Sequence, residues 1–140
     1  MTEGHYDKPL PLLDGFAKDF YGFCKQRELR FQRCRDCRAW RHVPREMCPQ
    51  CGSWNWDWEK SSGRGKIFTW TVVARPMHPA FKDDCPYAAV VVEMEEGVRL
   101  LSQVTDCPPD RLTVDAAVQV VFEDVNPEIA LPRFELASKP

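Results

Sequence analysis

Two Cys-x-x-Cys pairs constrain this chain of 140 residues more than any other feature of its sequence. Ten residues separate the pairs, and the second pair is followed by Gly52, which permits a tight turn. The chain has seven cysteines, and an odd number with this spacing favours metal ligation over a disulfide framework. The predicted metal ligands are Cys34, Cys37, Cys48 and Cys51.

Four thiolates complete the tetrahedral shell of one ion, so we predict a structural zinc with no open position for water or substrate. Iron in a rubredoxin-like tetrathiolate is the alternative. Against iron, Arg38 follows the first pair where a glycine would stand, and no redox partner motif is present. His42 lies between the pairs and is expected not to be a ligand, because the cysteines already fill the shell.

The remaining side chains form no catalytic pattern. Cys24, Cys85 and Cys107 have no basic or histidine neighbour in sequence that would lower a thiol pKa, so we interpret them as packing or neutral residues. The pair Glu95-Glu96 is interpreted as a solvated turn. No Ser/His/Asp order and no phosphate-binding loop is found. We therefore predict that the chain is not an enzyme by itself.

The N-terminal region is predicted to combine an extended arm with a short helix. Residues 1–13 contain two prolines and have no periodicity, which indicates the arm. Asp14 is expected to cap a helix that runs to about Glu28. Apolar side chains recur along it at helical spacing, namely Phe16, Phe20, Phe23 and Cys24. This stripe is buried either in the chain's own core or, through its three phenylalanines, against a partner protein.

Short strands are expected to flank the cysteine pairs. Residues 29–32 alternate apolar and polar side chains and lead into the first pair, as a strand does in a zinc ribbon. A second strand is predicted to place three alternating indoles on one face, those of Trp54, Trp56 and Trp58. The Ser-Ser-Gly-Arg-Gly sequence at 61–65 is typical of a turn, and we interpret it as a module boundary.

The sequence after this turn is β-like, and its prolines fall between apolar runs, where they cost no ladder hydrogen bond. Strands are expected at 66–74, 87–94, 98–105, 118–122 and 134–136. A small closed OB-fold barrel is the predicted arrangement, and a small sandwich is the competing one. The predicted fold class is mainly β. Its parts are an N-terminal arm and amphipathic helix at 1–28, a four-cysteine zinc ribbon at 29–62 and a five-stranded barrel at 63–140.

Charge is unevenly distributed along the chain, which has a formal net charge of −2. Residues 1–62 hold 11 Lys and Arg against 9 Asp and Glu, whereas residues 63–140 hold 8 against 12. The stretch 25–45 is the most basic, so an anionic ligand is expected there. Arginine pairs well with phosphate, although these arginines also balance an anionic thiolate cluster. The candidate residues for a phosphorylated ligand are Arg38, Arg41 and Arg45.

Composition excludes several classes of protein. A hydrophobic fraction of 44% with 29% charged residues fits a globular protein rather than a disordered one. No apolar run approaches the roughly 18 residues that a membrane span needs. The N-terminus is polar and lacks the apolar stretch of a signal peptide. We therefore expect a cytoplasmic protein that makes no use of a membrane.

Several motifs taken together resemble a known family. They are Lys8-Pro-Leu-Pro11, the run from Glu28 through both cysteine pairs to Ser53, Ser62-Gly-Arg-Gly65, Thr69-Trp-Thr-Val-Val73 and Pro86-Tyr87. The family is domain of unknown function 35, a rubredoxin-like zinc ribbon fused to an OB-fold, and the likeness covers about residues 8–137. Asp115 departs from the glycine that such proteins commonly carry, which affects a turn more than function.

The resemblance implies a role that the residues alone do not indicate. Such proteins are similar to accessory subunits of thiolase-like enzymes that act on coenzyme A thioesters, such as β-ketothiolases, acyltransferases and aldolases of lipid or aromatic degradation. The partner would hold the catalytic residues, and this chain would stabilise it and help to form the CoA or acyl site. By that analogy the helix with Phe16, Phe20 and Phe23 docks on the partner, and the stretch 38–45 lies near the nucleotide end of the cofactor.

Two other classes of function are weighed against this one. Zinc ribbons and OB-folds also occur in single-stranded nucleic-acid-binding proteins, where tryptophans stack on bases and arginines contact phosphates. The net negative charge of residues 63–140 argues against this class, because an OB-fold would place its binding groove there. An independent enzyme or iron redox protein is the third possibility, and it lacks an identifiable acid, base or nucleophile.

Overall fold

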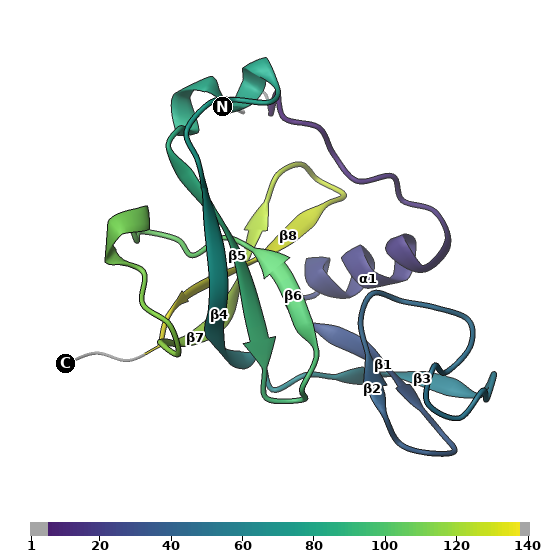
Figure 1. The fold of residues 1–140 in the computed structure, drawn as a ribbon. Coiled ribbons are helices and arrows are strands. Elements are labelled where there is room, and N and C mark those ends of the chain that lie inside the picture. Colours follow the sequence, from purple (N-terminus) through teal and green to yellow (C-terminus); the bar gives the residue numbers. More distant parts are fainter. Residues whose placement is uncertain (1–5, 138–140) are drawn as a thin grey trace.

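A computed structural model describes residues 6–137 of the chain. The first five residues of the expected N-terminal arm and the last three residues of the chain lie outside this range. The described part is mainly β: a helix and a small three-stranded sheet lie beside a curled five-stranded sheet (Figure 1). None of the described helices has the length and apolar character required to cross a membrane.

Helix α1 (Gly15–Lys25) follows an extended arm. The carbonyl of Asp14 accepts hydrogen bonds from the amides of Ala17 and Lys18, but its side chain makes no capping bond. The helix ends three residues before the predicted Glu28, because Arg27 takes a left-handed conformation with φ of 67°. The helix lies where the sequence predicts it. Its C-terminus is set by the left-handed conformation of Arg27, at a position where the sequence has no glycine to indicate it.

The small sheet is the zinc ribbon, made of β1 (Arg30–Cys34), β2 (Trp40–Arg41) and β3 (Trp56–Lys60) in the antiparallel order β2-β1-β3. Two of the alternating tryptophans lie in β3 and face α1: the ring centroids of Trp56 and Phe16 are 5.6 Å apart, and those of Trp58 and Phe23 are 5.7 Å apart. Trp54 precedes the strand and is 68% exposed. The indole face that the alternation predicts therefore holds two tryptophans instead of three.

The large sheet contains the five strands that the sequence predicts. They are β4 (Arg64–Val73), β5 (Tyr87–Met94), β6 (Arg99–Ser102), β7 (Ala117–Asp124) and β8 (Ala130–Leu136), in the order β6-β5-β4-β7-β8. The sheet curls into a half-barrel, and its edges meet where the Ser102 hydroxyl donates to the Pro132 carbonyl and Val104 bridges Phe134. This arrangement is consistent with an OB-fold and not with two stacked sheets. Two 3-10 turns, η1 (Pro79–Asp84) and η2 (Pro109–Arg111), lie in the connections.

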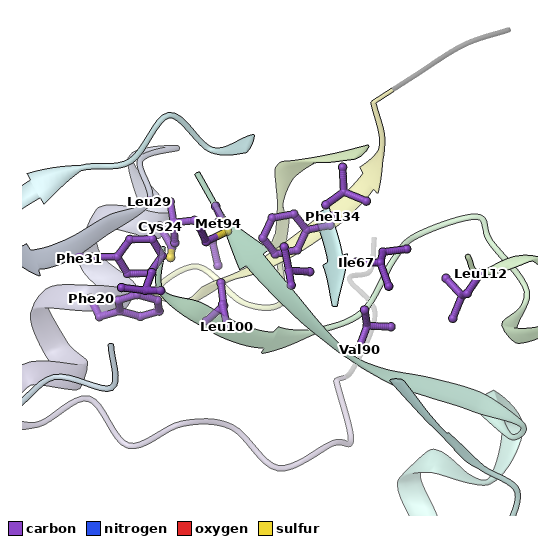
Figure 2. Packing of buried hydrophobic residues seen from close by; sticks show 14 residues of the cluster. Phe20, Cys24, Leu29, Phe31, Ile67, Val90, Met94, Leu100, Leu112 and Phe134 are labelled. Atoms are coloured by element: carbon purple, nitrogen blue, oxygen red, sulfur yellow. The ribbon is translucent and has the colours of Figure 1, made fainter. Parts of the chain in front are cut away.

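One hydrophobic core runs through the helix, the ribbon and the half-barrel (Figure 2). Cys24 from α1 and Phe31 from β1 lie beside Met94 and Leu100 of the barrel strands, and Phe134 continues the core toward the other end. Burial raises the pKa of the Cys24 thiol to about 12, so this cysteine stays protonated and serves as a packing residue. Since the core is shared, α1 is covered by its own chain.

Candidate metal centre

The four predicted ligands lie together at the end of the ribbon. Their sulfur atoms all lie within 4.8 Å of one another, and the shortest separations are 3.6 Å, from Cys34 to Cys51 and from Cys37 to Cys48. A tetrahedral zinc with bonds of about 2.3 Å requires sulfur atoms about 3.8 Å apart. The donor set and its spacing therefore fit one zinc ion, held by residues from the β1–β2 turn and from the long loop between β2 and β3.

Backbone amides converge on the sulfurs of both pairs. The amides of Asp36 and Cys37 donate to the Cys34 sulfur over 3.4 Å, and the amide of Gln50 donates to the Cys48 sulfur over the same distance. The hydrogen bond from the Cys37 amide, reinforced by that from Asp36, lowers the pKa of Cys34 to about 6. Amide hydrogen bonds likewise lower the pKa of Cys48. The folded loops therefore favour the thiolate form of Cys34 and Cys48. At Cys37 and Cys51, burial and the neighbouring sulfurs outweigh the amide hydrogen bonds and raise the pKa.

The two cysteine loops have matching backbone geometry. The Gly52 amide donates to the Cys48 carbonyl with φ of +80°, and the Arg38 amide donates to the Cys34 carbonyl with φ of 67°. Arg38 thus takes the left-handed position that a glycine would fill more easily. The Arg33 side chain donates to the Arg38 carbonyl over 2.8 Å and helps to hold this loop. The departure from glycine that argues against rubredoxin-type iron is accommodated without changing the loop.

His42 takes no part in the centre. Its ring packs between Phe20 and Phe31, with centroid distances of 5.3 and 5.1 Å. Burial lowers its pKa to about 4, so the ring is neutral at physiological pH. Within residues 6–137, the cluster suited to a metal consists of the four cysteines alone. All four positions of a tetrahedral ion are thus filled by protein, which makes the centre structural rather than catalytic.

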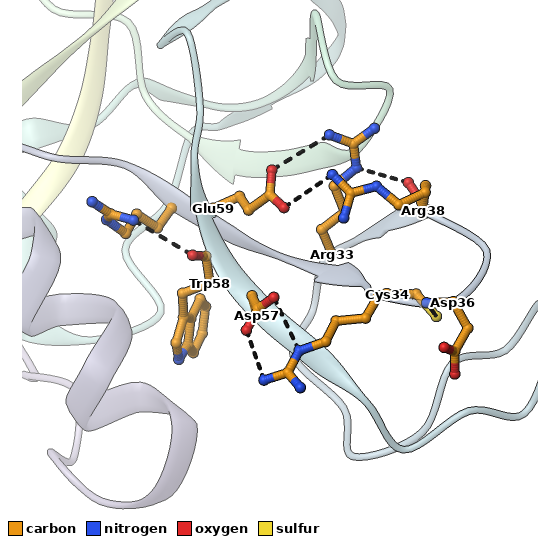
Figure 3. Close-up of polar contacts among 9 residues, drawn as sticks. Arg33, Cys34, Asp36, Arg38, Asp57, Trp58 and Glu59 are labelled. Atoms are coloured by element: carbon orange, nitrogen blue, oxygen red, sulfur yellow. Dashed lines mark hydrogen bonds and ion pairs between the residues drawn. The ribbon is translucent and has the colours of Figure 1, made fainter.

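Most arginines around the centre pair with carboxylates of β3. Arg33 and Arg38 both contact Glu59, at 3.4 and 3.3 Å, and Arg35 binds both oxygens of Asp57 (Figure 3). These pairs link β1 and the first cysteine loop to the neighbouring strand. Their side chains are partly or fully exposed, so each pair contributes little to stability. They do reduce the positive charge that the sequence places here.

The three candidate ligand-binding arginines occupy different environments. Arg38 is exposed and paired with Glu59. Arg41 is only 7% exposed, and its guanidinium donates to the Gln32 side chain over 2.8 Å and to the Arg45 carbonyl over 2.6 Å. The Arg45 side chain is exposed, while its amide donates to Gln32 over 2.7 Å. Arg41 therefore organises the loop, and Arg38 and Arg45 present their charges to solvent.

Gln32 is a further residue that shapes the site, and its sequence position does not predict this role. It is fully buried, and its amide oxygen accepts from both Arg41 and Arg45, which fixes the segment leading to the second cysteine pair. The alternating pattern of β1 suggests a polar residue facing solvent at this position. The role of Gln32 comes from its contacts with Arg41 and Arg45, which lie nine and 13 positions later, and the local sequence does not indicate these contacts.

The helix phenylalanines divide between core and surface of the same chain. Phe20 is buried in the shared core. Phe16 and Phe23 are partly exposed and pack edge-on against the indoles of Trp56 and Trp58. The geometry therefore accounts for the apolar stripe by intramolecular packing, and only the outer edges of Phe16 and Phe23 are open to another molecule.

The turn between ribbon and barrel is tightly held. The Ser61 amide donates to the Leu29 carbonyl, and one carboxylate, that of Glu96, accepts from the Ser61 hydroxyl and the Ser62 amide, both over 2.8 Å. Glu96 belongs to the turn between β5 and β6. Its interpretation as a solvated turn residue is therefore wrong, because it joins the barrel to the module boundary.

A Glu96→Ala variant is expected to lower the free energy of unfolding by about 1–3 kcal/mol, since it leaves the buried Ser61 hydroxyl without its acceptor. Urea unfolding followed by tryptophan fluorescence measures the change. Glu95→Ala is the matched control: Glu95 pairs with Arg64 at the surface, and its loss is expected to cost roughly 0–1 kcal/mol. Equal losses for the two variants would contradict a specific role for Glu96.

Comparison with known proteins places the chain in a family. Two family models match consecutive segments: the rubredoxin-like zinc ribbon domain of ChsH2 at residues 23–57 and the C-terminal OB-fold domain of ChsH2 at residues 58–123. A DUF35 domain-containing scaffold protein of Methanothermobacter thermautotrophicus is 34% identical, and the match covers 84% of that protein and 65% of this chain. The chain belongs to the DUF35 family.

Two further similar proteins are described by the names of enzymes. A solved chain described as Ltp2-ChsH2(DUF35) aldolase matches with a TM-score of 0.79 and 36% identity, over 86% of this chain and 94% of that one. A protein of Thermomonospora curvata described as "Probable enoyl-CoA hydratase alpha subunit" is 35% identical over 93% of this chain. This DUF35 chain spans only 40% of that hydratase subunit. The DUF35 fold thus occurs both alone and as a segment of longer proteins.

Proposed function

We propose that this chain is a non-catalytic subunit of an enzyme complex that acts on acyl-CoA thioesters. A thiolase-like partner, such as a β-ketothiolase, acyltransferase or aldolase, holds the catalytic residues. The chain stabilises this partner and helps to form the site for the CoA thioester. The observation that carries the proposal is the likeness to the Ltp2-ChsH2(DUF35) aldolase chain, with a TM-score of 0.79 over 94% of that chain.

The chemistry of the chain supports a non-catalytic role. Its metal centre has four sulfur donors and so leaves a zinc ion no position for water or substrate. Cys24 is buried with a raised pKa, which makes it a poor nucleophile. His42 is held neutral between two phenylalanine rings. When bound, the zinc would supply folding energy to the ribbon, and the chain's own residues would supply the surface that the partner contacts.

The exposed arginines supply a place for the phosphates of the thioester. We assign this contact to Arg38 and Arg45, whose side chains lie exposed on the ribbon, with Arg41 holding the loop beneath them. The carboxylates of β3 offset much of the remaining positive charge of the ribbon. A nucleic acid carries a negative phosphate at every nucleotide and would need uncompensated positive charge along its whole binding path. The arrangement therefore favours a small phosphorylated ligand over a single-stranded nucleic acid.

Partner binding is assigned to the ribbon and the outer side of α1. Trp54 is a large aromatic side chain that stands exposed directly after the second cysteine pair, and aromatic residues of this kind often dominate binding energy at interfaces. The partly exposed edges of Phe16 and Phe23 continue this apolar surface from Trp54 onto the helix. These residues together would form the surface on which the catalytic subunit docks.

Co-expression with a thiolase-like protein tests the proposal. We expect the two chains to elute together in size-exclusion chromatography and to turn over acyl-CoA only when both are present. Trp54→Ala is expected to weaken the complex about tenfold or more. Val114→Ala is the matched control, since Val114 is 62% exposed in the segment after η2 and lies outside the ribbon and α1. A thiolase-like protein that elutes separately and is fully active alone would overturn the proposal.

A further inference from the structure

A groove with a volume of about 820 Å³ lies between α1, the loop at 42–44 and strands β6 and β8. Its size falls within the range of roughly 300–1,000 Å³ that is typical of sites for small organic ligands. Strands β6 and β8 meet where the Ser102 hydroxyl donates to the Pro132 carbonyl, and the start of α1 lines the groove beside this contact.

The walls of the groove are mostly apolar. Phe20 and Leu100 form buried parts of the wall, and Leu101 and Val43 stand at its mouth with 68% and 65% of their surfaces exposed. Exposed large apolar side chains beside an apolar groove indicate a surface that another molecule covers. Leu131 and Pro132 complete the wall on the β8 side.

A few polar groups interrupt this apolar lining. Arg99 lies over the Phe68 ring at 3.8 Å and contacts the Glu93 carboxylate only at the long distance of 4.0 Å, so its charge is weakly compensated. Arg133, in contrast, binds Glu123 at 3.0 Å. The His42 Nδ1 atom is buried and has no hydrogen-bond partner within the described range of 6–137. His42 therefore lines the groove with a ring whose Nδ1 atom is covered by protein atoms.

We propose that this groove binds a small amphipathic anion, whose apolar body lies between α1 and the barrel edge and whose charged head contacts Arg99. An apolar groove with one weakly paired guanidinium at its edge matches a long-chain or ring-containing acid better than a sugar or a peptide backbone, because most of its lining offers no hydrogen bond. This inference concerns the isolated chain and does not depend on the proposed partner.

Titration of the zinc-loaded chain with dodecanoate, dodecyl phosphate and dodecanol tests the inference. Calorimetry gives the affinity of each ligand. Tryptophan fluorescence shows whether the ligand binds in the groove, because Trp56 contacts Phe16 in the groove wall. We expect saturable binding with one ligand per chain. The affinities of dodecanoate and dodecyl phosphate show which anionic head group is preferred. Dodecanol has no charge, so its affinity measures the contribution of the apolar chain alone. Arg99→Gln is expected to weaken the two anions about tenfold and to leave dodecanol unchanged.

Leu101→Arg and Val114→Arg form a matched pair, since both replace a highly exposed apolar side chain and only Leu101 lines the groove. Leu101→Arg is expected to weaken all three ligands at least tenfold, and Val114→Arg to leave them unchanged. Equal effects of the two variants, or binding that never saturates, would mean surfactant adsorption and would overturn the inference. If Leu101→Arg instead spares ligand binding and abolishes co-elution with the catalytic subunit, the groove is a protein interface and the inference also fails.

Discussion

A Cys34→Ser variant is expected to lose its zinc and, with it, the ordered structure of about residues 30–60. Metal binding by a four-cysteine site contributes on the order of 10 kcal/mol to folding. Cys34 is buried at the end of β1, where its sulfur accepts two amide hydrogen bonds, so a serine would remove a ligand without filling its place. Zinc analysis by mass spectrometry and amide NMR spectra of the ribbon residues measure the two losses.

Cys85→Ser and Cys107→Ser provide controls for this experiment. Both cysteines are partly buried and lie outside the four-sulfur cluster, so the variants are expected to keep one zinc per chain and an unchanged ribbon spectrum. The native protein is expected to be colourless, whereas iron in the site would give a visible charge-transfer band. A Cys34→Ser protein that retained both zinc and fold would show that the cluster is not the centre described above.

A Phe134→Ala variant is expected to lower the free energy of unfolding by about 3–5 kcal/mol, because it opens a cavity in a fully packed position. Phe134 lies in β8, its ring is fully buried, and its backbone accepts from Thr105 and donates to Gln103 where the barrel edges meet. The ring therefore fills the core beside the contact that closes the half-barrel. Urea unfolding at constant zinc concentration measures the loss.

Phe68→Ala removes the same atoms from an exposed position on β4 and serves as the matched control. Its ring contacts the Arg99 guanidinium, and loss of that contact is expected to cost only about 0.5–1 kcal/mol. A similar loss for both variants would mean that the end of the barrel at β8 is not packed as described. The comparison thus separates burial from the removal of an aromatic ring as such.

The metal centre and the strands could be predicted from the sequence because their signals are local. Two residues separate the ligands within each pair, and the chemistry of zinc admits few other arrangements of four cysteines. Strands β4, β5 and β7 are rich in β-branched residues, and prolines or the Glu96-Gly97 turn separate the apolar runs, so the sequence predicts all five strands. The last was predicted as residues 134–136 only and is observed as Ala130–Leu136, since Pro132 is accommodated in a strand at the sheet edge.

The roles of several polar residues could not be predicted because their partners are far away in the sequence. Glu96 and Ser61 are separated by 35 positions, and Gln32 acts on a loop that follows a separate strand. A local sequence pattern predicts that such residues lie on a polar face or in a turn. It does not predict which distant residues they will hydrogen-bond. Phe20 is a similar case. Helical spacing predicts that it belongs to an apolar stripe, but the three-dimensional structure is needed to show that residues of the same chain cover this stripe.

The position of α1 has a consequence for how the chain is made. The helix packs against β7 and β8, and Lys25 and Arg27 at its end both pair with Asp124, almost a hundred residues later. During translation, the ribbon can therefore close around its metal long before the helix finds its final neighbours. Until the last two strands leave the ribosome, the part of α1 that they cover stays in water, and a nascent chain in this interval exposes apolar surface that favours aggregation.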